Sequence, residues 1–312
     1  MHVVLLFPGQ GSQKPGMAKD LAEAFPAAKA VLDTADRALG VALSQLMFDG
    51  PAEELTLTHN AQPALLAHGA AVWAVVKDQL AGKVVAAAGH SLGEFTAYHA
   101  AGSLSVEDAV KLVRRRGELM YETGVKRPGA MAALLGETSR PIEEICAEAT
   151  KKAGTVVPAN YNCPGQLVIS GESAGVDKAM ELSKAAGMKR AIRLNVSGAF
   201  HSPLMAPAAD GLREALASAQ FSDPGFDVFA NVNAQPVRDA ATARQRLLDQ
   251  LVSPVRWTEE VTEMARRHPD ATFVEMGPGS VLAGLVKKII PNAKTMTCGT
   301  AAEVNQLLEA TA

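Results

Sequence analysis

The stretch VVAAAGHSLGEF, residues 84–95, decides the fold that we predict for this chain. A run of small apolar residues leads into GHSLG, in which Ser91 lies between two glycines, and helical periodicity follows at once. A strand, a sharp turn and a helix in this order form the nucleophile-elbow pattern, whose glycines leave room for the serine hydroxyl to project from the carboxyl edge of a sheet. Because GxSxG alone is a weak motif, the alternative is a polar residue in an ordinary glycine-rich turn.

The segments on both sides of this stretch alternate between strands and helices. We predict strands at 2–7, 84–89, 226–232 and 271–277, and helices at 19–39, 62–80, 94–102, 105–124 and 301–312. The first strand, HVVLLF, runs straight into the turn PGQGSQ, so it reads as a buried strand and not as a signal peptide. Strands that alternate with helices predict a parallel sheet covered by helices, which is an α/β fold.

Residues 126–195 interrupt this alternation with a pattern of their own. The predicted strands lie at 130–136, 155–162, 166–171 and 189–195, and the predicted helices at 139–154 and 172–187. The order βαββαβ is that of a complete ferredoxin-like unit. We therefore expect a core formed by residues 1–125 and 196–312, into which a ferredoxin-like subdomain at 126–195 is inserted.

Composition excludes several classes of function. The 312 residues are 48% hydrophobic, enough for a large core, and the net charge of -3 with 4% aromatic residues argues against nucleic-acid binding. Cys146, Cys163 and Cys298 lie far apart, so we expect neither a disulfide framework nor a metal site. No stretch approaches the roughly 18 apolar residues that a membrane span needs. We expect a soluble, cytoplasmic monomer.

A serine nucleophile needs a base, and histidine is the natural one near neutral pH. Of the seven histidines, His201 in the loop VSGAFHSPLM (196–205) is best placed to return to the edge of the sheet. His90 adjoins Ser91, but successive side chains at such a turn diverge. The alternative for His201 is a loop histidine without a role.

Arg116 is predicted to face the interior of its helix. At about 100° per residue, Arg116 falls beside the apolar face of this helix, whereas Arg114 and Arg115 point away from it. A buried guanidinium requires an anionic partner. The spacing leaves two partners open, an internal Asp or Glu in a core salt bridge, or the carboxylate of a substrate held by the guanidinium fork.

These residues and their neighbouring motifs resemble the malonyl-CoA:acyl carrier protein transacylases, the stand-alone relatives of the acyltransferase domains in fatty-acid and polyketide synthases. The resemblance covers essentially the whole chain. The motifs, in the expected order, are FPGQGSQ (7–13), QPALL (62–66), GHSLGE (89–94), RG (116–117), NCPGQLVISG (162–171), GAFHSPLM (198–205), SPVRW (253–257) and EMGPGSVL (275–282). The resemblance implies an α/β-hydrolase-like parallel-sheet core with the ferredoxin-like subdomain inserted.

The resemblance also implies roles for individual residues. Ser91 would be the acylated nucleophile, His201 its base and Arg116 the ligand of the malonyl carboxylate. The main-chain N–H groups of Gln10 and Leu92 would form the oxyanion hole. The carbonyl of Gln250 would orient the imidazole in place of the Asp of ordinary α/β hydrolases. Four further polar residues match positions near the pocket, without individual roles: Gln62, Asn160, Asn162 and Gln166.

The implied reaction moves a malonyl group from coenzyme A through a malonyl-serine ester to the phosphopantetheine thiol of an acyl carrier protein, without a cofactor. Phe200 would crowd the malonyl α-carbon and favour malonyl over methylmalonyl; alternatively it only packs the loop. The carrier protein is expected to be acidic and to bind transiently. Lys189 with Arg190, and Lys287 with Lys288, are candidate contacts for it, or ordinary surface residues.

Three other functions stay open at the level of the sequence. A serine esterase or thioesterase shares the serine turn but gives no reason for an inward Arg116. A trans-acting acyltransferase for a polyketide synthase or a malonate decarboxylase keeps the chemistry and changes the setting. A non-enzymatic scaffold descended from such an enzyme is disfavoured because each expected catalytic residue type is present.

Overall fold

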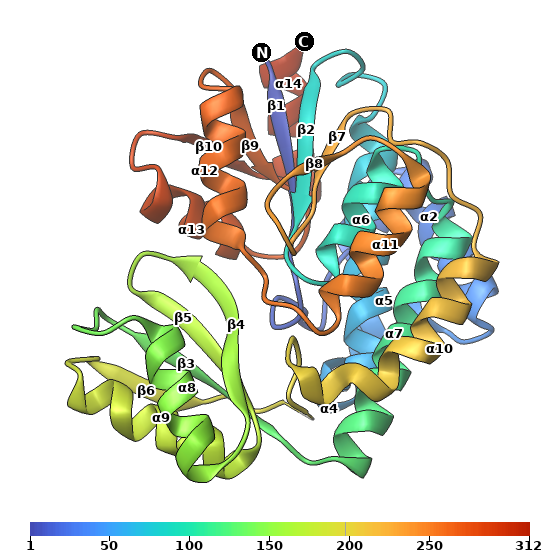
Figure 1. The fold of residues 1–312 in the computed structure, drawn as a ribbon. Helices are drawn as coiled ribbons and strands as arrows, with labels where there is room; N and C mark the ends of the chain where they lie inside the picture. Colours follow the sequence, from blue (N-terminus) through green and yellow to red (C-terminus); the bar gives the residue numbers. More distant parts are fainter. Residues whose placement is uncertain (197) are drawn as a thin grey trace.

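Two separate sheets organise the computed structural model, which describes residues 1–196 and 198–312 (Figure 1). Residue 197, in the loop predicted before His201, lies outside the described part. The larger sheet has six strands in the order β10-β9-β1-β2-β7-β8. Its strands are β1 (Val3–Phe7), β2 (Val84–Gly89), β7 (Asp227–Phe229), β8 (Pro236–Val237), β9 (Thr272–Glu275) and β10 (Lys294–Thr297). All neighbours pair in parallel except β7 and β8, so the α/β prediction is confirmed.

Helices cover both faces of this sheet because its strands are apolar on both sides. Val3, Leu5 and Phe7 of β1 pack into one apolar cluster, and Val4 and Leu6 pack into another, as the alternation of side chains along a strand requires. The helices of this larger unit are α1 (Lys19–Ala24), α2 (Pro26–Leu39), α3 (Leu43–Asp49), α4 (Ala52–Thr56), α5 (Thr58–Val76), α6 (Gly93–Ala100), α7 (Val106–Lys126), α10 (Ala206–Ser218), α11 (Ala240–Gln250), α12 (Trp257–Arg267), α13 (Val281–Ile289) and α14 (Ala301–Thr311), with a short 3-10 turn at Pro203–Met205.

The register of the central strands places two turns side by side. Phe7, the last residue of β1, pairs with Gly89, the last residue of β2, and the His90 N–H donates to the Phe7 carbonyl at 3.0 Å. The turn PGQG after β1 therefore adjoins the turn that carries Ser91. Both lie at the carboxyl edge of the sheet, which faces the smaller unit (Figure 1).

The smaller unit is an antiparallel sheet of four strands in the order β4-β5-β3-β6, with two helices on one face. Its elements are β3 (Ala130–Leu135), α8 (Ile142–Ala153), β4 (Val156–Cys163), β5 (Gln166–Gly171), α9 (Ser173–Ala185) and β6 (Arg190–Arg193). Ala132, Leu134 and Ile145 belong to an apolar cluster that this unit does not share with the larger one. Two main-chain hydrogen bonds to Val255 join β4 to the segment before α12.

The main differences from the sequence prediction are local. The helix predicted at 19–39 is divided at Phe25, whose extended backbone (φ -129°, ψ 113°) reflects the restriction that Pro26 places on the residue before it. Ser105 caps α7 by accepting the N–H of Asp108 at 3.0 Å, in the predicted spacing. The strands predicted at 226–232 and 271–277 are shorter, and β8, β10, α3, α4, α10, α11, α12 and α13 were not predicted.

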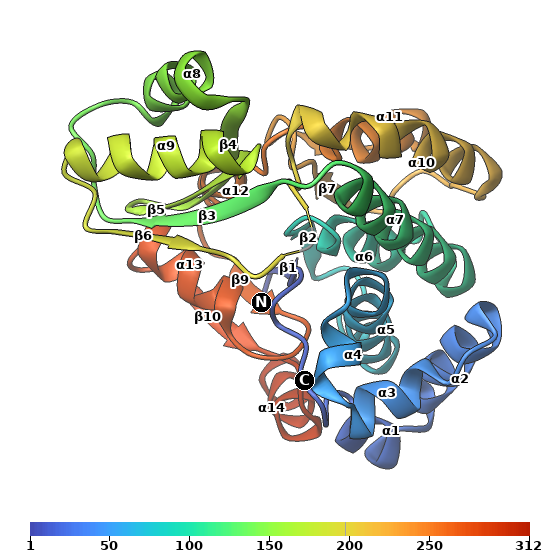
Figure 2. The same ribbon diagram turned by 90° about the horizontal axis from the view of Figure 1, so that it is seen from below.

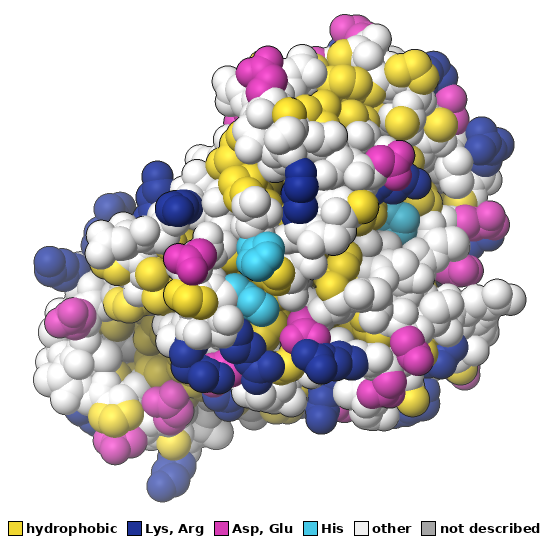
Figure 3. Space-filling model, turned by 90° about the horizontal axis from the view of Figure 1, so that it is seen from above, with side chains coloured by type: hydrophobic (Ala, Val, Ile, Leu, Met, Phe, Trp, Pro, Cys, Tyr) yellow, Lys and Arg dark blue, Asp and Glu magenta, His cyan; other side chains and the backbone are white. Residues whose placement is uncertain are grey.

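The surface carries both signs of charge. The face seen in Figure 3 carries Lys and Arg side chains as well as Asp and Glu side chains, as expected from the small net charge. Within the described residues, no helix combines the length and apolar character that crossing a membrane requires. The three cysteines are free and buried.

Candidate active site

Ser91 lies on a tight turn between β2 and α6, in a left-handed backbone conformation with a φ of 53°. This conformation is uncommon for a residue with a side chain and has to be imposed by surrounding contacts. The flanking glycines make the turn possible. A Cβ added at Gly89 would lie 1.9 Å from the carbonyl carbon of Gly93, and one added at Gly93 would lie 2.1 Å from the carbonyl oxygen of Phe7. The turn thus has the predicted strand–turn–helix geometry.

His201 reaches Ser91 from the loop that follows the smaller sheet. Its Nε2 lies 2.8 Å from the Ser91 Oγ, and its Nδ1 lies 3.0 Å from the carbonyl oxygen of Gln250 and 3.2 Å from that of Ser253. Since carbonyl oxygens only accept hydrogen bonds, Nδ1 carries the ring proton and Nε2 can accept the hydroxyl hydrogen. Burial, and then the positive charge of Arg116, lower the pKa of His201 to about 3, so the ring is neutral near pH 7.

Arg116 projects from α7 into the same place and is 1% exposed. Its NH1 donates to the Gln62 Oε1 at 2.8 Å, and its NH2 donates to the Gln250 Oε1 at 2.9 Å and to the Ser91 Oγ at 3.0 Å. The guanidinium carbon also lies 5.6 Å from the ring centre of Phe95. Figure 2 shows α7 running beside α5 and α6, the helices that carry Gln62 and Phe95.

One of the two partners considered for Arg116 was an internal Asp or Glu in a core salt bridge. Among the described residues, Arg116 forms no salt bridge with an Asp or Glu. Its partners are neutral oxygens, and its buried Nε has no hydrogen-bond partner among the described residues. Burial lowers the pKa of Arg116 to about 10, an effect that attraction to Glu94 partly offsets, so the group stays charged at pH 7. A buried cation in this state has unused capacity for an anion.

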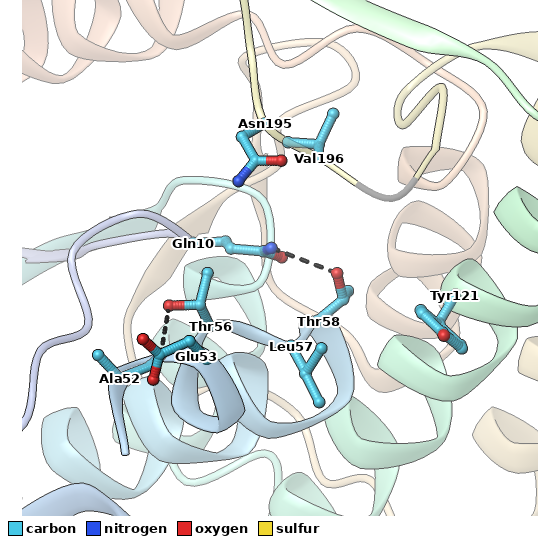
Figure 4. A pocket seen from close by; sticks show the side chains of 9 residues that line it. All are labelled: Gln10, Ala52, Glu53, Thr56, Leu57, Thr58, Tyr121, Asn195 and Val196. Atoms are coloured by element: carbon cyan, nitrogen blue, oxygen red, sulfur yellow. Dashed lines mark hydrogen bonds between the residues drawn. The ribbon is translucent and has the colours of Figure 1, made fainter. Parts of the chain in front are cut away.

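Ser91, His201 and Arg116 line one small cavity of about 130 Å³. Gln10, Gln62, Leu92, Asn160 and Phe200 line it as well, together with His90, Met120, Met131, Leu194 and Val196. A larger cleft of about 480 Å³ adjoins it, because Gln10 and Val196 line both. Figure 4 shows this cleft between the α4–α5 region on one side and Asn195 and Val196 on the other. The small cavity thus has an open approach.

The main-chain N–H groups of Gln10 and Leu92, expected to form the oxyanion hole, belong to the two adjacent turns. Neither N–H has a hydrogen-bond partner within residues 1–196 and 198–312. Leu92 precedes the first residue of α6, where the helix dipole favours negative charge. These donors are therefore available to an oxygen that enters the cavity.

The remaining candidates divide into those at the cavity and those away from it. Asn162 does not line the cavity, but its Oδ1 lies 2.9 Å from the Nε2 of His90, which does. Gln166 also does not line it; it pairs with Cys163 at the end of the β4–β5 hairpin. The two basic pairs lie elsewhere, Lys189 and Arg190 at the start of β6, and Lys287 and Lys288 in the last turn of α13.

A buried polar network behind Ser91 was not foreseen from the sequence. The side-chain Nε2 of Gln250 donates to the Glu94 Oε2 at 2.7 Å and to the Ser91 carbonyl at 2.9 Å. Asn231 links Glu94 to Glu260, and all four network side chains are fully buried. Burial raises the pKa of Glu94 to about 7 and that of Glu260 well above its usual range. Asn231 lies inside the segment predicted as a strand at 226–232, where a polar residue within an apolar run was the available signal.

The fold and the site together define a class. A serine at a strand–helix turn, in contact with a neutral histidine and beside free N–H donors, has the geometry of enzymes that form acyl-serine intermediates. Within the described residues, no cluster of His, Cys, Asp and Glu could hold a metal ion.

Comparison with known proteins gives the family. The acyl transferase domain family matches residues 4–304, and the chain belongs to it. The malonyl CoA-acyl carrier protein transacylase of Bacillus subtilis is 48% identical over 294 residues, which are 94% of this chain and 92% of that protein.

Solved structures agree with this membership. An acyl-carrier-protein-S-malonyltransferase from Bartonella henselae superposes with a TM-score of 0.94 at 41% identity, over 100% of this chain and 99% of that one. A malonyl-transacylase in complex with its type II PKS acyl-carrier protein superposes with a TM-score of 0.93 at 40% identity, over 99% and 100% of the two chains.

Proposed function

We propose that this chain is an [acyl-carrier-protein] S-malonyltransferase that moves malonyl from coenzyme A to an acyl carrier protein and so supplies extender units for fatty-acid synthesis. One observation carries the proposal. The Ser91 Oγ lies 2.8 Å from a neutral imidazole nitrogen and 3.0 Å from a buried guanidinium, so one cavity offers a nucleophile, its base and a ligand for an anion. The similarity to malonyltransferases over the whole chain supports the same reaction.

The first half-reaction makes an ester on Ser91. As the Ser91 oxygen bonds to the thioester carbon of malonyl-CoA, Nε2 of His201 takes its proton. The carbonyl oxygen becomes an oxyanion, which the N–H groups of Gln10 and Leu92 stabilise. The carbon–sulfur bond then breaks, the imidazolium returns the proton to sulfur, and coenzyme A leaves as a thiol.

The second half-reaction releases the acyl group. His201 takes the proton of the phosphopantetheine thiol, sulfur attacks the malonyl-serine carbonyl, and the ester oxygen of Ser91 leaves and recovers the proton. Since each acceptor reacts with the acyl-enzyme only after the first product departs, the kinetics are ping-pong. The main-chain carbonyl of Gln250 keeps the proton of His201 on Nδ1 through both steps.

Arg116 selects the acyl group by its charge. The free carboxylate of malonyl replaces a neutral hydrogen-bond partner of the buried guanidinium and forms a charge-assisted fork with it. An acetyl group leaves that buried charge without an anion, a difference of roughly several kcal/mol. Phe200, buried in the cavity wall, limits the space beside the malonyl α-carbon and disfavours a methyl branch there.

The remaining assignments follow from the same proposal. The large unit, at 1–125 and 196–312, is α/β-hydrolase-like, which the serine turn at the carboxyl edge of its sheet supports. The insertion at 126–195 is ferredoxin-like, which the strand order β4-β5-β3-β6 supports. The chain acts as a cytoplasmic monomer on a transiently bound, acidic carrier protein. The free cysteines support a reducing compartment.

Polyketide synthesis is the second candidate setting, because one similar solved structure is a malonyl-transacylase bound to its type II PKS acyl-carrier protein. The reaction would be unchanged and only the carrier would differ. Competition between carrier proteins of the two pathways for the malonylated enzyme distinguishes the settings.

The deciding experiment follows the fate of radiolabelled malonyl in the presence and absence of holo carrier protein. We expect the label on the carrier thiol when the carrier is present, and little free malonate in either case. Rapid release of malonate with no labelled carrier would assign the chain to the esterases or thioesterases instead.

A further inference from the structure

The side chain of Asn231 holds the Ser91 turn from inside the protein. Asn231 is 0% exposed and comes two residues after β7, the strand beside β2. Its Oδ1 accepts the Ser91 N–H at 2.9 Å, and its Nδ2 donates to the Gly89 carbonyl at 2.8 Å. The two bonds span the turn, joining the end of the strand to the serine itself.

The amide of Asn231 can adopt only one of its two orientations. Its Nδ2 lies 3.0 Å and 3.2 Å from the two carboxyl oxygens of Glu260, and its Oδ1 accepts the Gln250 Nε2 at 3.2 Å. A flipped amide would set N–H groups against the Ser91 N–H and the Gln250 amide, and oxygen against the Gly89 carbonyl. The Asn231 main-chain N–H also donates to the Glu94 Oε2 at 3.0 Å. Asn231 is therefore fixed by donors and acceptors on several elements.

The turn needs such a clamp because Ser91 adopts a left-handed backbone conformation, with a φ of 53°. A strained residue of this kind keeps its conformation only where its surroundings over-determine it. Relaxation of Ser91 would move its hydroxyl away from His201 and Arg116, which it contacts at 2.8 Å and 3.0 Å. A displacement of about 1 Å can lower the rate of such a reaction about 100-fold.

We propose that Asn231 is a positioning residue for the nucleophile, which fixes the main chain of Ser91 so that its hydroxyl stays aligned with His201. The inference rests on the proposed function, in which Ser91 is acylated. It also explains why the oxyanion donors are Gln10 and Leu92, since the N–H of Ser91 is already occupied by Asn231.

The test compares Asn231→Ala with Val228→Ala. Val228 is equally buried, lies on β7 three residues earlier, packs in the apolar core, and lines neither the small cavity nor the adjoining cleft. Both variants lose buried contacts, so both should lower the midpoint of thermal unfolding. The comparison isolates the effect on the turn. The readouts are the rate of malonyl-serine formation in quenched samples, measured by intact-protein mass spectrometry, and kcat and KM for malonyl-CoA.

We expect Asn231→Ala to slow malonyl-serine formation and kcat by about 10- to 100-fold, with KM for malonyl-CoA within about threefold of wild type. Val228→Ala should keep kcat within about twofold of wild type. A kcat for Asn231→Ala as high as that of Val228→Ala, or a defect confined to KM, would overturn the proposal while leaving the transferase function standing. Failure of the wild-type protein to form any malonyl-serine would instead overturn the function.

A second measurement needs no variant and keeps the proposal testable if Asn231→Ala does not fold. Hydrogen exchange followed by NMR on the wild-type protein reports the Ser91 amide directly. We expect strong protection, because this N–H is bonded to a buried oxygen although it lies outside any strand or helix ladder. Exchange as fast as that of an exposed loop amide would overturn the clamp.

Discussion

Replacement of Arg116 by Ala tests how the site recognises its acyl group. The guanidinium is 1% exposed, so its hydrogen bonds to a substrate carboxylate form out of contact with water. Charge-assisted hydrogen bonds contribute about 1.5 to 3 kcal/mol each, and a two-pronged contact therefore about 3 to 6 kcal/mol. At about 1.4 kcal/mol for each factor of ten, kcat/KM for malonyl-CoA should fall by about 100- to 10,000-fold. Acetyl-CoA, which lacks the carboxylate, should lose far less.

The assay measures kcat/KM for both thioesters with the same carrier protein, in the wild type and in two variants. Arg115→Ala is the matched control, because Arg115 is the neighbour on the same helix but is exposed and forms its ion pairs with Glu118 and Glu122. It should behave as wild type. Equal losses for malonyl-CoA and acetyl-CoA in Arg116→Ala would refute the reasoning and make Arg116 a structural residue.

Three further predictions concern the base, the cavity wall and the buried network. Because the pKa of His201 is lowered to about 3, its basic form persists as pH falls. Rates of acylation measured by stopped flow should therefore stay within about twofold between pH 8 and pH 5. A loss of roughly tenfold or more, as expected for an ordinary imidazole, would contradict this. Phe200→Ala should raise kcat/KM for methylmalonyl-CoA relative to malonyl-CoA by about tenfold, measured by competition; an unchanged ratio would limit Phe200 to packing. For Glu94, whose pKa is raised to about 7, the folded state binds the proton more tightly than the unfolded state, so its contribution to stability falls as pH rises from about 4.5 to about 7. Urea unfolding at pH 5 and pH 8 should show a smaller pH effect in Glu94→Gln than in wild type, and equal effects would exclude this role.

The parts of the site that the sequence could predict are those that depend on local patterns. The strand and glycines around Ser91 define its turn, and helical spacing was enough to turn Arg116 inward. His201 was harder, because only its place in a loop and the family resemblance favoured it over the other histidines. For Ser91 and Arg116, a short segment of sequence contains most of the physical information.

The parts that the sequence did not predict depend on contacts between distant segments. The side chain of Gln250 joins Arg116 to Glu94 across elements far apart in the chain, and no spacing rule anticipates that. Gln166 pairs with Cys163 at the end of the β4–β5 hairpin and does not line the cavity, so a role near the pocket stays a prediction. The division of the first long helix at Phe25 was missed because its apolar periodicity continues through the break, although the proline signal was present.

The central claim is that the hydroxyl of Ser91 carries the acyl group between two thiols. Peptide mapping by mass spectrometry, after brief mixing with malonyl-CoA and again after addition of holo carrier protein, observes this directly. The account predicts a malonyl ester on the peptide that contains Ser91, its disappearance when the carrier is added, and no adduct in Ser91→Ala. An adduct on another residue, or an ester that persists in the presence of the carrier, would contradict it.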